Sequence, residues 1–275
     1  MTREQKYQAF KTLHERSGIF VIPNPWDAGT AKILTALGFE ALATTSSGYA
    51  FSIGRRDSNT DVTREQTLAN ARAIVEATHL PVSADMQDGF GPSPDSCSEM
   101  VQLAAAIGLA GGSIEDATGD PDSPIYDFQL AVERIEAAAE TAHTHNFLLT
   151  ARAENFLHGR PNLDDTIKRL QAFEQAGADV LYAPALPGLE AIRQVCASVS
   201  KPVNVLMGLQ GATFSVEQLA AAGVKRISVG GSFARAALGG FVRAAREVKE
   251  KGTFTYAADA IPGAEVTAFM TNDNR

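Results

Sequence analysis

The chain has 275 residues, of which 45% are hydrophobic and 20% charged, and its mean hydropathy is -0.07. This composition is typical of a globular protein with a sizeable core, and it argues against membrane residence. The net charge of -8 and the single Trp, without a Lys/Arg stripe, argue against nucleic acid as a partner.

The beginning of the chain, MTREQKYQAFKTLHERSG, is polar and helix-like and lacks the apolar segment of a secretory signal. No run of about 18 apolar residues occurs in the sequence, so we expect no transmembrane helix. The cysteines Cys97 and Cys196 stand far apart, with no CxxC or Cys/His spacing nearby, and are predicted to be structural. We therefore expect a cytoplasmic protein.

Eight short apolar runs occur along the chain, and a longer segment with helical spacing follows each, a pattern that indicates βα units. The runs are GIFVIPN (18–24), EALATTS (40–46), LPVSADM (80–86), GGSIEDA (111–117), FLLTARAE (147–154), ADVLYAPA (178–185), KPVNVLM (201–207) and KRISVGG (225–231). Several helical segments end in a Gly before the next strand, as in ALGFEAL, AIGLAGGSI, QAGADVL and AAGVKRI. A glycine at this place is typical of a helix whose last turn ends in the left-handed backbone conformation. Thr63 and Ser215, with Gln66 and Gln218 at the capping-box positions, are predicted helix N-caps.

Alternating units of this kind can form a doubly wound open sheet or a closed (β/α)8 barrel. No GxGxxG follows the first strand, and polar residues stand at the C-terminal ends of many strands, which favours the barrel. We predict an α/β protein, a single (β/α)8 TIM-barrel domain over residues 1–275. The segment from about 252 to 275 is predicted to be a helical tail that packs on a neighbouring subunit.

Acidic residues concentrate where barrel enzymes keep their sites. Asp57 follows the second run, Asp85 ends the third, and Glu115 and Asp116 end the fourth. Because converging carboxylates repel one another, we expect a hard divalent cation among them. Asp85 and Asp116 could instead cap the helices that follow them.

Four segments resemble, in order and spacing, motifs of the isocitrate lyase/phosphoenolpyruvate mutase superfamily: GRRDSN (54–59), SADMQDGFG (83–91), SIEDA (113–117) and TARAENFLHG (150–159). The resemblance begins at NPWDAGTAKILTALGFEAL (24–42) and runs to the eighth strand. Ordered motifs of this kind are a stronger signal than any single one.

The resemblance implies a Mg²⁺ site, in which Mn²⁺ could substitute. Asp85 would bind the metal directly, Asp57 and Glu115 would act through metal-bound water, and Gln87 would stand at a further ligand position. The family usually carries Asp or Glu where this chain has Gln87, so the metal affinity is expected to be lower. Asp88 could replace the lost charge, but strand alternation would direct it to the other side.

The resemblance also implies a substrate site. The backbone N–H groups of Thr45, Ser46 and Ser47 would hold a carboxylate or an enolate oxygen. Arg152 would grip a carboxylate, and Asn204 would contact the substrate. Alternatively, the Thr-Ser-Ser segment is an ordinary loop, Arg152 only pairs with Glu154 or Glu115, and Asn204 only satisfies backbone groups. The candidate catalytic residues are Asp57, Arg152 and Glu115.

The loop after the fourth strand departs from the family. Isocitrate and methylisocitrate lyases carry a KKCGH loop with an acid cysteine there, and phosphoenolpyruvate mutases carry a lysine and an asparagine. This chain reads EDATGDPDSPIYDF, without Cys, Lys, His or Asn. Both activities are therefore disfavoured.

Other residues have two interpretations. His158 could contact substrate or carry a proton, while His143 and His145 are expected to be solvated. The segment Gly230-Gly231-Ser232 after the eighth strand could form a phosphate-binding site, or its glycines could permit close helix packing. Tyr182 and Tyr49 are expected to pack in the core rather than to line a pocket.

We predict a Mg²⁺-dependent enzyme that cleaves or forms a carbon–carbon bond next to the carbonyl of a small 2-oxo carboxylate, through an enolate, as a lyase or oxaloacetate decarboxylase. The alternatives are a C–P bond enzyme of the phosphonopyruvate hydrolase or phosphoenolpyruvate mutase type, a 2-oxo acid binding barrel without catalysis, and a phosphate-handling barrel of another family. The resemblance further implies a homo-oligomer, a tetramer built from dimers that exchange their last helix. The apolar content of FTYAADAIPGAEVTAFM agrees with such packing.

Overall fold

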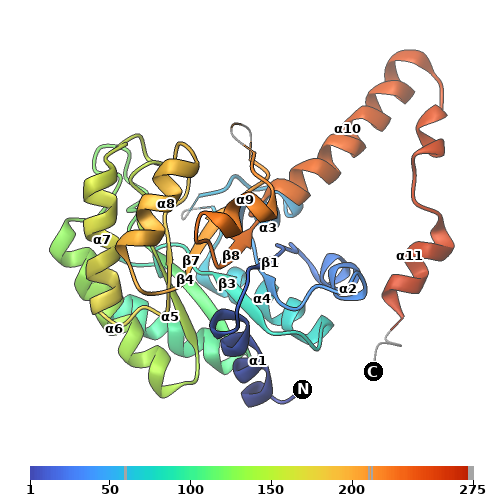
Figure 1. The fold of residues 1–275 in the computed structure, drawn as a ribbon. Helices are drawn as coiled ribbons and strands as arrows, with labels where there is room; N and C mark the ends of the chain where they lie inside the picture. The colour runs from blue at the N-terminus through green and yellow to red at the C-terminus, as the bar shows by residue number, and fades with distance from the viewer. Residues whose placement is uncertain (59–60, 210, 212, 272–275) are drawn as a thin grey trace.

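The computed structural model describes residues 1–58, 61–209, 211 and 213–271, and it shows an α/β barrel of eight parallel strands (Figure 1). Each predicted run contains one strand, so the predicted barrel is confirmed. The strands are β1 (Phe20–Ile22), β2 (Leu42–Ala43), β3 (Val82–Asp85), β4 (Gly111–Glu115), β5 (Leu148–Arg152), β6 (Val180–Tyr182), β7 (Val203–Leu206) and β8 (Arg226–Ser228).

The strands are hydrogen-bonded in the order β1-β8-β7-β6-β5-β4-β3-β2, so the ring closes between β1 and β2. At this seam the Ala43 N–H donates to the Pro23 carbonyl oxygen (3.0 Å). The Asn24 side chain spans the junction: its Nδ2 donates to the Thr44 carbonyl oxygen (2.8 Å), and its Oδ1 accepts from the N–H groups of Val229 and Gly230 (2.9 Å each). One side chain therefore ties together the chain after β1, β2 and β8.

Helices alternate with the strands and surround them (Figure 1). They are α1 (Arg3–Glu15), α2 (Ala28–Ala36), α3 (Ser46–Ser52), α4 (Arg64–Ala77), α5 (Pro94–Ala106), α6 (Phe128–Thr144), α7 (Leu163–Gln175), α8 (Leu189–Ser198), α9 (Val216–Ala221) and α10 (Ser232–Lys251). The predicted capping boxes of Thr63 and Ser215 are both present. The predicted glycine stops are confirmed by positive φ angles at Gly38, Gly108, Gly177 and Gly223.

The N-terminal helix α1 closes one end of the barrel. Its Phe10 and Leu13 pack with residues at the starts of strands, among them Phe20 and Leu148. Burial of one such side chain contributes about 2 kcal/mol. Apolar side chains therefore fill this end of the barrel. A larger core lies between the strands and the outer helices. It includes Cys97, and Cys196 packs against this core; both cysteines are free thiols.

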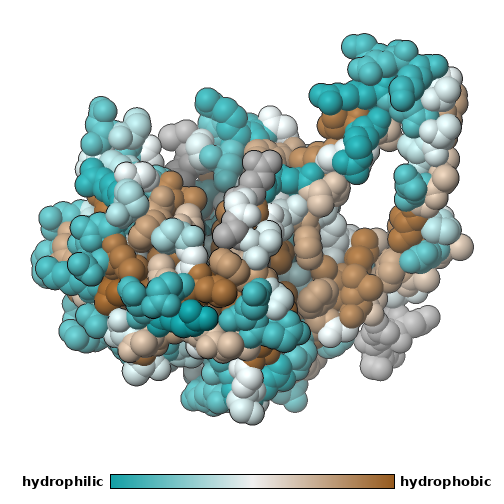
Figure 2. Space-filling view, turned by 45° about the horizontal axis from the view of Figure 1, so that its top comes forward, coloured by the Kyte–Doolittle hydropathy of each residue, from teal (hydrophilic) through white to brown (hydrophobic). Residues whose placement is uncertain are grey.

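A C-terminal extension follows the eighth βα unit. Helix α10 projects from the barrel, a 3₁₀ helix η1 (Thr255–Ala258) follows, and α11 (Gly263–Met270) returns beside α2 (Figure 1). Figure 2 shows an open gap between this C-terminal extension and the barrel. Lys32 Nζ of α2 donates to the Met270 carbonyl oxygen (3.0 Å). The last residues of the predicted tail, 272–275, and Asn59 of the first motif lie outside the described residues.

Among the described residues, no helix has the length and apolar character needed to cross a membrane.

Candidate active site

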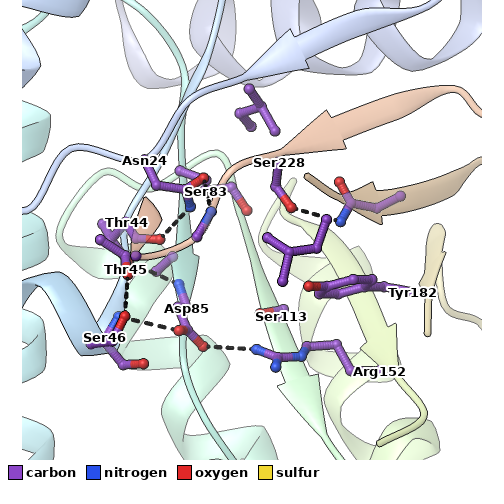
Figure 3. A pocket seen from close by; sticks show the side chains of 18 of the residues that line it. Asn24, Thr44, Thr45, Ser46, Ser83, Asp85, Ser113, Arg152, Tyr182 and Ser228 are labelled. Atoms are coloured by element: carbon purple, nitrogen blue, oxygen red, sulfur yellow. Dashed lines mark hydrogen bonds and ion pairs between the residues drawn. The ribbon is translucent and has the colours of Figure 1, made fainter. Parts of the chain in front are cut away.

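A cavity of about 200 Å³ opens at the C-terminal ends of the strands. Every strand contributes to its lining, from Ile22 of β1 to Ser228 of β8. Figure 3 shows how the polar side chains converge on this space. Enzymes with this architecture keep their active sites at this end of the barrel, where the loops can vary without disturbing the core.

Asp85 lies in the cavity as the last residue of β3. Its Oδ2 accepts from the Ser46 N–H (3.2 Å), and its Oδ1 faces Nη1 of Arg152 (3.2 Å), so the carboxylate lies between the two (Figure 3). Its own N–H donates to Thr44 Oγ1 (2.9 Å). The following helix is capped by Ser93 instead. Asp85 is therefore a cavity residue and does not cap a helix.

The Thr45-Ser46-Ser47 segment begins the short helix α3 and lines the cavity. Thr45 Oγ1 accepts from the Gly48 N–H (3.3 Å) and holds the first turn. A Cβ atom at Gly48 would lie 2.6 Å from Thr45 Cγ2, so the turn requires glycine there. The Ser46 N–H donates to Asp85, a carboxylate of the protein, and its role as a donor to the substrate stays a prediction.

Arg152 ends β5 and is surrounded by carboxylates. It contacts Asp85 (3.2 Å), Glu115 (3.0 Å) and Glu154 (2.8 Å), and its guanidinium lies over the Tyr182 ring, 5.1 Å from the centroid. Burial alone would lower the pKa of Arg152, but these carboxylates raise it above its usual value. Arg152 thus both lines the cavity and forms the ion pairs considered as its alternative role.

The carboxylates around Arg152 carry more negative charge than it can neutralise. Burial raises the pKa of Glu115 well above its usual value; Arg152 opposes this, and Glu154 and Asp85 add to it. Burial and the neighbouring Asp85 also raise the pKa of Asp57, against a hydrogen bond from Ser46. A further cation would relieve this repulsion.

The residues present fit a Mg²⁺ ion, which prefers oxygen ligands and keeps several waters. Asp85 and Asp57 line the cavity, whereas Glu115 and Gln87 lie outside its lining. Gln87 is buried in the left-handed region (φ 51°), and its Oε1 has no hydrogen-bond partner among the described residues. Among the described residues, no group of three or more His, Cys, Asp or Glu side chains is arranged to bind a metal ion by itself. The set therefore suits an ion with few direct protein ligands.

Two acidic residues lie elsewhere. Asp116, expected in the cluster, is buried and accepts from Arg169 (3.0 Å) and from the Glu154 N–H (2.7 Å). Burial raises its pKa to about 6. It does not cap helix α6 either, since Asp127 does so. Asp88 accepts from the Tyr126 hydroxyl (3.3 Å) and does not line the cavity, as predicted, but a turn at Gln87 (φ 51°) rather than strand alternation sets its direction.

One wall of the cavity includes residues that sequence reasoning missed. Asn204 was predicted, but its contacts Arg226 and Ser228 were not. Tyr182, expected in the core, is buried and also lines the cavity, whereas Tyr49 does not line it. The available signal was the alternation in KRISV, which directs Arg226 and Ser228 to the same side of β8.

The loop after β4 folds on itself. An antiparallel bridge joins Ala117 to Ile125, and the Thr118 N–H donates to the Pro124 carbonyl oxygen (3.0 Å). No residue from 116 to 126 belongs to the cavity lining of the described structure. The loop therefore presents neither an acid nor a base to the cavity.

Three further candidates have structural explanations. His158 lies 3.8 Å from the buried Glu154 and does not line the cavity. The N–H of Gly230 already donates to Asn24. A Cβ atom at Gly231 would lie 2.2 Å from Ser47 Oγ, so close packing accounts for this glycine. His143 is exposed, as expected.

Comparison with known proteins identifies relatives along most of the chain. The family model described as phosphoenolpyruvate phosphomutase matches residues 10–249. An uncharacterized Mycobacterium tuberculosis protein is 30% identical over 88% of this chain and 89% of its own. The 2-methylisocitrate lyase of Escherichia coli K12 is 28% identical over 79% of this chain and 75% of its own. The crystal structure of a candidate lyase/mutase from Burkholderia cenocepacia J2315 is 52% identical, with a TM-score of 0.95, and covers 98% of this chain and 97% of its own.

Proposed function

The chain belongs to the phosphoenolpyruvate mutase/isocitrate lyase superfamily, and we propose that it is a Mg²⁺-dependent enzyme that cleaves or forms a carbon–carbon bond next to the carbonyl of a small 2-oxo carboxylate. The observation that carries the proposal is the position of Asp85. It lies between a backbone N–H donor and Arg152, in a cluster with excess negative charge. A small anion bound through a divalent cation would complete this arrangement.

Asp85 would hold the cation, and Asp57 and Glu115 would contact it through water. Bound there, Mg²⁺ supplies positive charge to oxygens that become negative during the reaction. The Ser46 N–H donates to Asp85 Oδ2 and so fixes the position of this carboxylate at the cavity. Arg152 sets the position of Asp85 and Glu115 through its ion pairs.

Loss of CO₂ from oxaloacetate is the reaction that best fits the folded loop after β4. Decarboxylation generates the enolate directly, so the site needs only to stabilise the oxyanion, and water can supply the later proton. Cleavage of isocitrate or methylisocitrate requires a positioned acid, and no residue of the loop from 116 to 126 lines the cavity. A modest oxyanion contribution of roughly 3 kcal/mol corresponds to about a hundredfold in rate.

The test is a side-by-side assay of oxaloacetate decarboxylation, methylisocitrate and isocitrate cleavage, and phosphonopyruvate hydrolysis, with Mg²⁺ or Mn²⁺. The Asp85→Ala variant controls for catalysis by free metal. We expect oxaloacetate to be the best substrate and Asp85→Ala to be inactive. Faster cleavage of isocitrate or methylisocitrate would contradict the proposed reaction. The phosphonopyruvate arm tests carbon–phosphorus chemistry, the type of reaction for which the matching family model is named. Metal-dependent binding without any product would indicate a binding protein.

A further inference from the structure

Arg226 is a buried arginine at the closed end of the cavity. It begins β8, is 5% exposed and belongs to the cavity lining. Its Nε donates to Asn204 Oδ1 (2.8 Å), its Nη2 donates to Thr150 Oγ1 (3.0 Å), and its Nη1 lies 3.3 Å from His14 Nε2. All three partners are uncharged when His14 is neutral.

His14 is neutral in this network. Its Nδ1 lies 2.8 Å from the Phe10 carbonyl oxygen, to which it can only donate, so Nε2 is the acceptor for Arg226. Burial, together with the charge of Arg226, lowers the pKa of His14 to about 3. The network therefore contains one positive charge and no negative charge.

Two other arginines of the barrel, Arg152 and Arg169, are paired with carboxylates. Arg152 contacts three carboxylates, and Arg169 pairs with Asp116 and Asp165. No ion pair of Arg226 exists among the described residues. Burial lowers its pKa to about 10, so it remains charged at neutral pH. A buried charge without a counter-charge is costly, and a bound anion can offset that cost.

Arg226 also fixes the orientation of Asn204. The guanidinium can only donate, so the amide oxygen of Asn204 must face it and the amide –NH₂ must face away. This –NH₂ donates to Ser228 Oγ (3.0 Å), and both residues line the cavity (Figure 3). Ser228 is further hydrogen-bonded to Tyr182. The amide –NH₂ of Asn204, a neutral group with two N–H bonds, therefore lies at the cavity wall, and the positive charge of Arg226 lies behind it.

We propose that Arg226 is a positioning residue that makes this wall select dicarboxylates: it turns the Asn204 amide toward the cavity, and its charge is balanced by the second carboxylate of the ligand. This inference rests on the proposed function, which places the 2-oxo acid group at Asp85. Arg152 is already shared among three carboxylates and has little charge left for a ligand. Contact through neutral donors also suits decarboxylation, because a direct ion pair would stabilise the carboxylate that must leave.

The experiment is a calorimetric titration of the full chain with Mg²⁺ and either malate or lactate, stable analogues that differ by one carboxylate. We expect the wild type to bind malate at least about tenfold more tightly. In Arg226→Met the affinities for malate and lactate should differ by no more than about threefold, mainly because malate binds more weakly. Arg226→Gln, which keeps a donor for Asn204 but no charge, should lie between. For oxaloacetate, Arg226→Gln should raise KM more than it lowers kcat.

Arg134→Met is the matched control, because Arg134 is also buried and its guanidinium donates to the backbone carbonyls of Gly91 and Asp88, outside the cavity. It should keep the wild-type ratio of malate to lactate affinity. An unchanged ratio in either folded Arg226 variant overturns the inference, and so does a wild type without preference for malate, even if it turns over 2-oxo acids. A wild type that prefers malate but turns over no substrate contradicts the proposed function, and the affinity ratio in the Arg226 variants then still decides the inference.

Discussion

At the scale of single residues, Asp85 is the side chain whose removal should separate ligand binding from folding. We predict that Asp85→Ala abolishes divalent-metal-dependent binding of 2-oxo acids and leaves the thermal unfolding temperature close to that of the wild type. The reason is that Asp85 faces the cavity, while Arg152 keeps its contacts with Glu115 and Glu154. Calorimetry with Mg²⁺ measures the effect.

Asp57→Ala provides the comparison, because Asp57 lines the same cavity but is expected to act only through water. Its effect on metal affinity should be smaller. Unchanged metal affinity in Asp85→Ala would remove the central assignment of the site.

Arg152 holds together three carboxylates that repel one another. We predict that Arg152→Met lowers the free energy of unfolding by about 3–5 kcal/mol, because it leaves Asp85, Glu115 and Glu154 without their partner. Added Mg²⁺ should raise the unfolding temperature of this variant more than that of the wild type, since the ion replaces part of the lost charge. Thermal unfolding with and without Mg²⁺ tests this. Equal shifts would argue against a cation site beside Arg152.

The sequence allowed Asp85, Ser46 and Arg152 to be placed at one mouth, because the ends of parallel strands meet there and the motifs mark those ends. It failed for Asp116. Neighbouring residues of a strand point to opposite sides, so Glu115 reaches Arg152 while Asp116 reaches Arg169. Arg226 was missed because alternation alone does not distinguish an inward residue that packs from one that lines a cavity.

At the scale of elements, α1 is joined to the barrel by a side chain that titrates. The pKa of His14 falls from 6.5 to about 3 on folding, so its neutral form is the one that the fold stabilises. The resulting stability is fully present above pH 6.5 and is lost as the pH falls towards 3. We predict that the free energy of unfolding decreases by up to about 1.4 kcal/mol per pH unit in this window on account of His14.

Denaturant unfolding of wild type and His14→Gln at pH 7 and pH 5 measures this contribution. The variant keeps an acceptor for Arg226 but does not titrate, so the wild type should lose about 2 kcal/mol more than the variant over this interval. Parallel losses in the two proteins would show that His14 is not the responsible group.

Helix and strand positions were predictable to different degrees. The capping boxes and glycine stops are local signals, and the helices begin and end where those signals stand. Strand lengths were not predictable. The run EALATTS contains only the two-residue strand β2, because Thr45 already caps α3. Side-chain hydrogen bonding at Thr45 determined this boundary, and apolar periodicity does not report it.

At the scale of the whole molecule, the C-terminal extension leaves apolar side chains in solvent. Phe241 is 71% exposed, Phe254 65% and Ile261 51%. Burying such residues against a second copy would be favourable by about 25 cal/mol per Å². We predict a homo-oligomer, a tetramer built from dimers, in which this extension packs on a neighbouring subunit. Light scattering at micromolar concentration checks the mass, and a monomer would refute the prediction.

The seam between β1 and β2 is the most weakly hydrogen-bonded junction of the barrel. In the part of the chain that the structure describes, no ladder joins these strands, and the contacts at Pro23 and Asn24 contribute only about 1 kcal/mol each. Local opening should therefore start there, since the amides with the fewest supporting contacts exchange first. Deuterium should enter residues 42–46 well before residues 148–152. The side of the active site that carries Ser46 would then open transiently while the side that carries Arg152 stays folded.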